Sequence, residues 1–166
     1  MPRSVQKGFT LIELLVVIAI IAVLAAVVVI VLNPLELTRR SRDATRLSDF
    51  EGIQKALNVV MQESEGVTDV LCNGSAPCSG VSHIGSRATD GTGWIPVNLG
   101  SQNTVQVPTL PIDPSNSTAY HYSYYSDGVT YELNTVLESE QQGVKMEEDG
   151  GDDLTVFESG TNLELI

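Results

Sequence analysis

Basic residues are scarce over most of this 166-residue chain, which limits what its larger part can bind. After residue 46 only Lys55, Arg87 and Lys145 are basic, against eighteen acidic residues, so this part carries a formal charge of −15. Because clustered Lys and Arg side chains bind phosphates, we expect no nucleic-acid binding by this acidic part. Its acidity is typical of a surface that keeps an exported domain soluble.

Cysteine is almost absent, with only Cys72 and Cys78 in the chain. Two cysteines cannot supply the four ligands of a structural zinc site, and the two histidines, His83 and His121, are far apart in the sequence. In an exported domain we expect the cysteines to form a short-loop disulfide, the alternative being two reduced thiols on a flexible loop. So short a loop stabilises a fold only modestly, because it removes little entropy from the unfolded chain.

The sequence also lacks the residue patterns of the common catalytic sites. It contains no G-x-S-x-G elbow, no P-loop, no H-E-x-x-H motif and no Rossmann glycine pattern. His83 and His121 have no paired nucleophile, and His121, in a tyrosine-rich run, is expected to be a cross-strand packing residue. With one Trp, three Phe and five Tyr, the chain affords a modest core. We therefore expect no enzyme.

What the chain does have is one long apolar run, residues 9–32, with neither Gly nor Pro and with Glu13 as its only charged residue. At ~1.5 Å per residue it covers roughly 36 Å, enough for a membrane-spanning helix. The run is too long for the apolar part of a secretory signal peptide, and no small-residue cleavage site follows it. A carboxylate inside such a helix is costly in lipid and so requires a partner or a functional reason.

Positive charges lie on both sides of the apolar run. Arg3 and Lys7 precede it and favour a cytoplasmic N-terminus, but more arginines follow it, so the charge rule alone leaves the orientation open. The segment 38–46 is polar all round, which predicts that it is solvated or contacts lipid headgroups or another chain. The arginines that follow the run are Arg39, Arg40, Arg42 and Arg46.

The residues from Gly8 to Glu13 (GFTLIE), placed directly before an apolar helix, resemble the start of type IV prepilins, a family that includes pilins and the pseudopilins of type II secretion. The resemblance implies that a prepilin peptidase and methyltransferase cuts between Gly8 and Phe9 and that Phe9 is then N-methylated. The mature chain, 9–166, would carry a formal charge of −14. The resemblance also implies a cytoplasmic N-terminus, with the acidic domain outside the membrane.

The resemblance also gives Glu13 a role in assembly. In the family, the matching glutamate lies near the N-terminal amine of a neighbouring subunit in the filament. Opposite charges attract strongly in a medium of low dielectric constant, which offsets desolvation and can set the axial register of incoming subunits. The alternative is a glutamate at the headgroup level that favours the positive end of the helix dipole.

The expected function that follows from the resemblance is that of a structural subunit. The subunit waits in the cytoplasmic membrane, and an assembly ATPase and a platform protein then build copies of it into a helical filament. The filament would be an extracellular pilus, or a periplasmic pseudopilus if the chain is a pseudopilin of type II secretion. Outside the family, the alternative is a bitopic membrane protein whose acidic head binds a ligand without polymerising.

Hydrophobic periodicity predicts an α+β fold, a long N-terminal helix packed on a small antiparallel sheet. Asn33 and Pro34 are expected to end or kink the first helix, and the pattern predicts one long helix, 9–64, with a bend there. Beyond the bend an apolar stripe predicts packing on the sheet, made by Leu47, Phe50, Ile53, Leu57, Val60 and Met61. The expected parts are a leader (1–8), a membrane or filament-core helix (9–32), an amphipathic helix (33–64) and a globular head (65–166).

Within the head, the strongest strand signal is a hairpin. Residues 119–125 and 129–137 flank Asp127-Gly128, which predicts a two-residue turn and a half-buried sheet. One face would carry Tyr120, Tyr122 and Tyr124 in the first strand and Val129, Tyr131 and Leu133 in the second. Before the hairpin we expect a loop at 67–93, an edge strand at 94–99 and a short strand at 105–107.

The last part of the chain is acidic and rich in glycine. Residues 138–153 predict a mobile surface loop, and 154–158 and 162–166 predict short terminal strands. Clustered carboxylates and turn glycines can bind calcium, as the C-terminal loops of the major pseudopilins do, and the candidate ligands are Asp149, Asp152 and Asp153. The spacing is not that of an EF-hand, and we expect no other cofactor.

Overall fold

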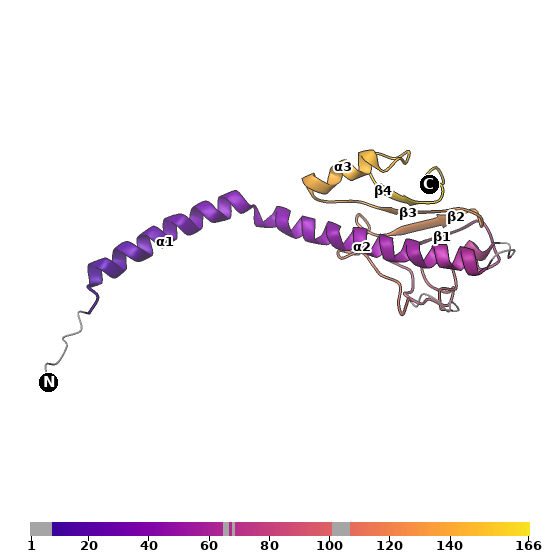
Figure 1. The fold of residues 1–166 in the computed structure, drawn as a ribbon, viewed down its shortest axis with the longest axis horizontal. Helices are drawn as coiled ribbons and strands as arrows, with labels where there is room; N and C mark the ends of the chain where they lie inside the picture. Colours follow the sequence, from indigo (N-terminus) through magenta and orange to yellow (C-terminus); the bar gives the residue numbers. More distant parts are fainter. Residues whose placement is uncertain (1–7, 65–66, 68, 101–106) are drawn as a thin grey trace, which may run out of the picture. The chain divides into compact units, whose positions relative to one another are not determined.

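The computed structural model describes residues 8–64, 67, 69–100 and 107–166. The chain divides into two compact units, one ending at Thr38 and the other running from Arg39 to Ile166 (Figure 1). The first unit is helical, and the second contains a small antiparallel sheet, so the predicted α+β class is confirmed. The predicted leader, 1–8, lies outside the described residues except for Gly8.

The N-terminal helical region consists of α1 (Leu11–Leu32) and α2 (Pro34–Glu63), separated by one residue. The predicted end of the first helix at Asn33 and Pro34 is therefore confirmed, whereas the prediction of one continuous bent helix is wrong at this point. Asn33 adopts a left-handed conformation with φ 40°, which Asn tolerates better than most residues. Pro34 begins α2, where its missing N–H is one that the helix would leave unpaired in any case.

The sheet is a four-stranded antiparallel meander, in which each strand pairs with the next in the order β1-β2-β3-β4 (Figure 1). Its strands are β1 (Cys78–Val81), β2 (Ser123–Ser126), β3 (Tyr131–Thr135) and β4 (Phe157–Gly160). Two short helical elements accompany it, η1 (Val70–Cys72) and α3 (Glu140–Glu148).

The core of the second unit forms where the apolar stripe of α2 meets the sheet. The Phe50 and Tyr122 rings meet edge to face with centroids 5.2 Å apart. The predicted packing of this helix on the sheet is therefore confirmed. The buried residues of α2 are Phe50, Ile53, Ala56, Leu57 and Val60, and those of the sheet and its margins are Tyr122, Tyr124, Tyr131 and Leu133.

The turn of the predicted hairpin is longer than expected. Ser126 pairs with Tyr131, so four residues, 127–130, connect β2 to β3 rather than two. The carboxylate of Asp127 accepts hydrogen bonds from the backbone N–H groups of Val129 (2.8 Å) and Thr130 (2.6 Å), which closes the wider turn. Asx turns of this kind compete with the tight backbone turn that the Asp-Gly pair predicts. Val129 is consequently exposed instead of facing the core.

Two further predictions are wrong in the segment before the hairpin. The expected loop at 67–93 contains η1 and β1, whose Ser and Gly residues have low strand propensity and are ordered by pairing with β2. The expected strand at 94–99 is irregular apart from one bridge between Asp90 and Asn98, although Trp94 is buried. Trp94 packs directly on Gly80, where a Cβ would lie 1.9 Å from the Trp94 carbonyl oxygen.

The C-terminal part also differs from the prediction. The expected loop at 138–153 contains α3, which begins where the Ser139 hydroxyl accepts a hydrogen bond from the N–H of Gln142. β4 begins three residues later than the predicted terminal strand, and the tail 162–166 forms no strand. Every residue of β3 is buried, so the sheet is not half-buried at this strand. Residues 105 and 106 lie outside the described part of the chain, and Val107 is irregular.

Candidate processing and assembly site

The predicted cleavage site lies immediately before α1. Phe9 is 85% exposed, and a Cβ added at Gly8 would have no atom of the described chain within 4 Å. The bond between these residues is therefore sterically open to a peptidase. Packing against the described residues does not require a glycine at this position.

Thr10 and Glu13 form a reciprocal cap at the start of α1. The Glu13 carboxylate accepts hydrogen bonds of 2.8 Å from both the backbone N–H and the hydroxyl of Thr10. In return the Thr10 hydroxyl oxygen accepts a 3.3 Å hydrogen bond from the N–H of Glu13. This capping box starts the helix and gives the glutamate a local partner in the single chain. The carboxylate is exposed, and its cap partner Thr10 directly follows Phe9, where cleavage would create a new amine.

α1 exposes apolar side chains on all sides. The stretch Leu11–Val31 is long and apolar enough to cross a membrane. Large exposed side chains occur along its full length and include Leu11, Ile18, Leu24 and Val31. A helix that is apolar all round is stable only when lipid or other protein surrounds it. The N-terminal helix thus supports membrane anchoring and, equally, burial among other chains.

The arginines at the start of the second unit divide into two kinds. Arg39 is exposed, whereas the side chain of Arg46 is 0% exposed. Arg46 binds Asp43 through Nη1 (2.7 Å), Asp113 through Nε (2.6 Å) and Glu138 through Nη2 (2.6 Å). The prediction of a segment that is solvated all round is therefore wrong at Arg46 and Asp43. The prediction fails there because two carboxylates distant in the sequence lie against this turn of α2.

The cluster holds three parts of the fold together. Asp43 also accepts hydrogen bonds from the backbone N–H groups of Glu138 (2.9 Å) and Ser139 (2.8 Å), and Arg42 forms an ion pair with Glu138. The hydrogen bonds from Arg42 lower the pKa of Glu138 to about 2, with burial opposing the shift and Arg46 adding to it. Glu138 is therefore ionised at neutral pH. The cluster joins α2 to the segments that contain residues 113 and 138.

The acidic candidates for calcium are spread along the loop between α3 and β4. Asp149 accepts hydrogen bonds from the N–H groups of Gly151 (3.0 Å) and Glu158 (2.7 Å). Asp153 accepts one from the N–H of Thr155 (2.8 Å), and Asp152 is exposed. Their oxygens support the backbone of the loop, and no three ligating side chains gather as a metal site among the residues that the structure describes. Calcium binding therefore stays a prediction.

Glu132 on β3 and Glu158 on β4 are two buried carboxyl groups, 0% and 2% exposed. Glu132 Oε2 accepts hydrogen bonds from the N–H groups of Leu165 (2.7 Å) and Ile166 (3.2 Å), and Glu158 Oε2 accepts one from Asp153 (3.1 Å). Within the described chain the Oε1 atom of each glutamate has no hydrogen-bond partner. Burial, with a smaller contribution from Glu132, raises the pKa of Glu158 to about 7.

The raised pKa of Glu158 predicts that the head becomes less stable as the pH rises towards 8. Because the pKa of Glu158 in the folded head exceeds its ordinary value of 4.5, the folded state binds the proton more tightly than the unfolded state. The stabilisation is complete below pH 4.5 and is lost as the pH rises through 7. Over this range the free energy of unfolding of the parent should fall by about 1–3 kcal/mol more than that of the variant Glu158→Gln, which has no carboxyl group to titrate here. Urea unfolding between pH 5 and 8, followed by Trp94 fluorescence, measures the difference; a difference that stays constant with pH would contradict it.

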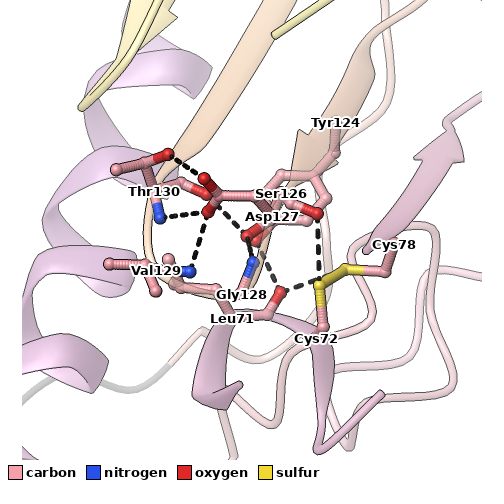
Figure 2. Close-up of a disulfide and its surroundings, with 9 residues drawn as sticks. All are labelled: Leu71, Cys72, Cys78, Tyr124, Ser126, Asp127, Gly128, Val129 and Thr130. Atoms are coloured by element: carbon pink, nitrogen blue, oxygen red, sulfur yellow. Dashed lines mark hydrogen bonds between the residues drawn. A yellow bond between two sulfur atoms is a disulfide. The ribbon is translucent and has the colours of Figure 1, made fainter. Parts of the chain in front are cut away.

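Cys72 and Cys78 are joined in a disulfide, with Cα atoms 5.5 Å apart. Figure 2 shows the bond beside the turn between β2 and β3. The hydroxyl of Tyr124 donates a 2.7 Å hydrogen bond to the carbonyl of Leu71, next to the first cysteine. A Cβ at Gly128 would lie 2.7 Å from the Cβ of Ala76, so the turn lies tightly against the disulfide loop.

Removing the disulfide is expected to destabilise the head by a limited amount. The closed loop spans residues 72–78, and the entropy that such a loop withholds from the unfolded chain corresponds to about 2 kcal/mol. We expect the double variant Cys72→Ser/Cys78→Ser to lose this amount in urea unfolding. A reductant should produce the same loss in the parent chain and none in the variant. Equal stability of the reduced and oxidised parent would contradict the prediction.

The sequence predicts roles for residues at the N-terminus but does not predict the Arg46 cluster. Its pattern groups Arg46 with the solvated arginines and does not single out Asp113 or Glu138. The period of the helix offered one signal, because Asp43 and Arg46 are three residues apart and share a face with buried Phe50. The distant carboxylates carry no comparable signal.

Comparison with known protein families supports the N-terminal assignment. Residues 3–29 match the family model described as the prokaryotic N-terminal methylation motif. No curated protein and no solved structure matches the chain. The matched segment contains Gly8, Phe9 and Glu13 and extends through most of α1. Residues 3–29 of this chain are therefore the signature of a type IV prepilin, as their resemblance to that family predicted.

Proposed function

We propose that the chain is a structural subunit of a type IV pilus-like filament. It is made as a membrane-anchored prepilin, cut after Gly8, methylated on the amine of Phe9 and polymerised through its apolar helix. The observation that carries the proposal is the methylation motif over residues 3–29, joined to a helix that is apolar on every side. Both an extracellular pilus and a periplasmic pseudopilus are built by this route.

The open geometry around Gly8 supports processing. A Cβ built at Gly8 meets no atom of the described residues within 4 Å, and Phe9 is exposed, which allows an extended backbone to enter a peptidase cleft. The cut leaves α1 on the mature chain and removes Arg3 and Lys7. The partner expected for the cut and for the methylation of Phe9 is one enzyme, a prepilin peptidase and methyltransferase.

The surface of α1 supports polymerisation. Removing its exposed apolar side chains from water is favourable by ~25 cal/mol for each Å² buried. Lipid would bury them before assembly, and the helices of other copies would bury them in the filament. This contribution has no preferred register, because any apolar helix surface suits it equally. Glu13 is the one charged residue of α1 and is therefore the residue able to select a register, by pairing with the amine of a neighbouring Phe9. An assembly ATPase and a platform protein are the partners expected to move subunits from membrane to filament.

The mature N-terminus tests the proposal directly. We expect mass analysis of the cellular protein to find a chain that begins with Phe9 and carries one methyl group on its amine. A variant with Gly8→Glu should accumulate at full length in the membrane, because the larger charged side chain prevents the cut. If the uncut chain is the stable form of the parent protein, the proposal is wrong.

A further inference from the structure

The two histidines of the chain, distant in sequence, lie side by side in the head. Beyond the end of the β1–β2 ladder, the N–H of Ser82 donates to the carbonyl of Tyr122, and the N–H of Tyr122 donates to the Ser82 hydroxyl, both at 2.9 Å. Continuing the register by one residue places His83 opposite His121. Their rings are in contact, with centroids 4.5 Å apart and planes inclined by 54°.

Both rings carry a nitrogen for which the described residues supply no partner. Nδ1 of His83 and Nδ1 of His121 are buried, and neither has a hydrogen bond within the part of the chain that the structure describes. A buried polar atom without a partner costs about 1–3 kcal/mol. Simple stacking of two aromatic rings leaves this cost in place at both nitrogens. A ligand that accepts two lone pairs at once would remove it.

We propose that His83 and His121 form a two-imidazole binding site for a divalent transition-metal ion, with Cu²⁺ as the best-suited metal. Cross-strand neighbours stand about 4.5–5.5 Å apart at Cβ, so both rings can reach one ion without a change in the backbone. Imidazole suits copper, nickel and zinc, and copper binds most tightly to a given set of nitrogen ligands. Water would complete the coordination, since no third ligating side chain joins the pair among the described residues.

The composition of the chain makes the site unusually simple to test. His83 and His121 are its only histidines, and the two cysteines are bonded to each other, so neither another imidazole nor a free thiol competes for copper. The full-length chain in detergent is titrated with Cu²⁺ and studied by electron paramagnetic resonance. We expect one Cu²⁺ per chain with hyperfine splitting from two imidazole nitrogens.

The variants His83→Gln and His121→Gln each remove one ligand. Each should lose the two-nitrogen spectrum and bind Cu²⁺ at least about tenfold more weakly, the size of effect that even an outer contact of a metal site produces. The matched control is Glu147→Gln/Glu148→Gln, which removes two exposed carboxylates and should leave the spectrum unchanged.

Trp94 fluorescence shows whether each variant is folded. A parent spectrum with one nitrogen or none would overturn the proposal. The proposal would also be overturned if the folded double variant His83→Gln/His121→Gln binds Cu²⁺ as the parent does. The binding would then belong to carboxylates or to the N-terminus. The test does not depend on filament formation, so the site and the proposed function can fail separately.

Discussion

A chain with Glu13→Ala is expected to enter the membrane and to be cut after Gly8, yet to form no filaments. The substitution leaves the apolar surface of α1 intact, so the drive to leave water is unchanged. It removes the one charge on α1, and with it the pairing that selects a register among otherwise equivalent helix contacts. Electron microscopy of sheared surface material should show filaments from the parent and none from the variant, while mass analysis shows a mature N-terminus in both.

Two further variants separate the charge of Glu13 from its role in the helix cap. Glu13→Gln keeps an oxygen that accepts hydrogen bonds from Thr10 but carries no charge, and we expect it to abolish filaments as the alanine variant does. Thr10→Val removes the hydroxyl of the capping box and keeps the charge, so we expect filaments to persist. If the glutamine variant assembles normally, Glu13 acts as a cap and not as a charge.

The sequence was sufficient for the features that depend on local pattern. An apolar run without Gly or Pro predicts α1, and apolar residues at helical spacing predict the face of α2 that packs on the sheet. The GFTLIE segment is sufficient to place Gly8, Phe9 and Glu13 in a processing signature, which the family comparison supports. In each case the residues that decide the structure are neighbours in the chain or on one helix.

Features that depend on contacts distant in sequence were not predictable in the same way. β1 has a sequence of low strand propensity and exists because β2 lies beside it. His83 and His121 meet only because the register of that pairing continues beyond the ladder. The Asp127 turn is a competition between two local alternatives, in which side-chain hydrogen bonds to Val129 and Thr130 prevail over the tighter turn.

The second large effect is expected at Arg46, which we predict cannot be replaced by Met without a loss of about 3–5 kcal/mol in the free energy of unfolding. Met replaces the aliphatic part of the arginine side chain but carries no charge. The substitution leaves Asp43 and Asp113, 0% and 2% exposed, without the guanidinium that binds both, while Glu138 retains Arg42. Two buried carboxylates without a cation are strongly unfavourable, because the interior does not replace their lost hydration. Arg39→Met removes the same charge from an exposed position and should change stability by less than about 0.5 kcal/mol.

The pH dependence of the Arg46→Met variant distinguishes lost charge from lost packing. With the guanidinium gone, the buried carboxylates gain by taking up protons, so the deficit relative to the parent should shrink as the pH falls from 7 to 4. A loss caused only by altered packing would be the same at both values. Urea unfolding followed by Trp94, which is buried and donates to the carbonyl of Pro111 at 2.9 Å, reports on the head alone. A deficit below about 1 kcal/mol at pH 7, or one that acid leaves unchanged, would show that the cluster does not hold α2 to the head through its charges.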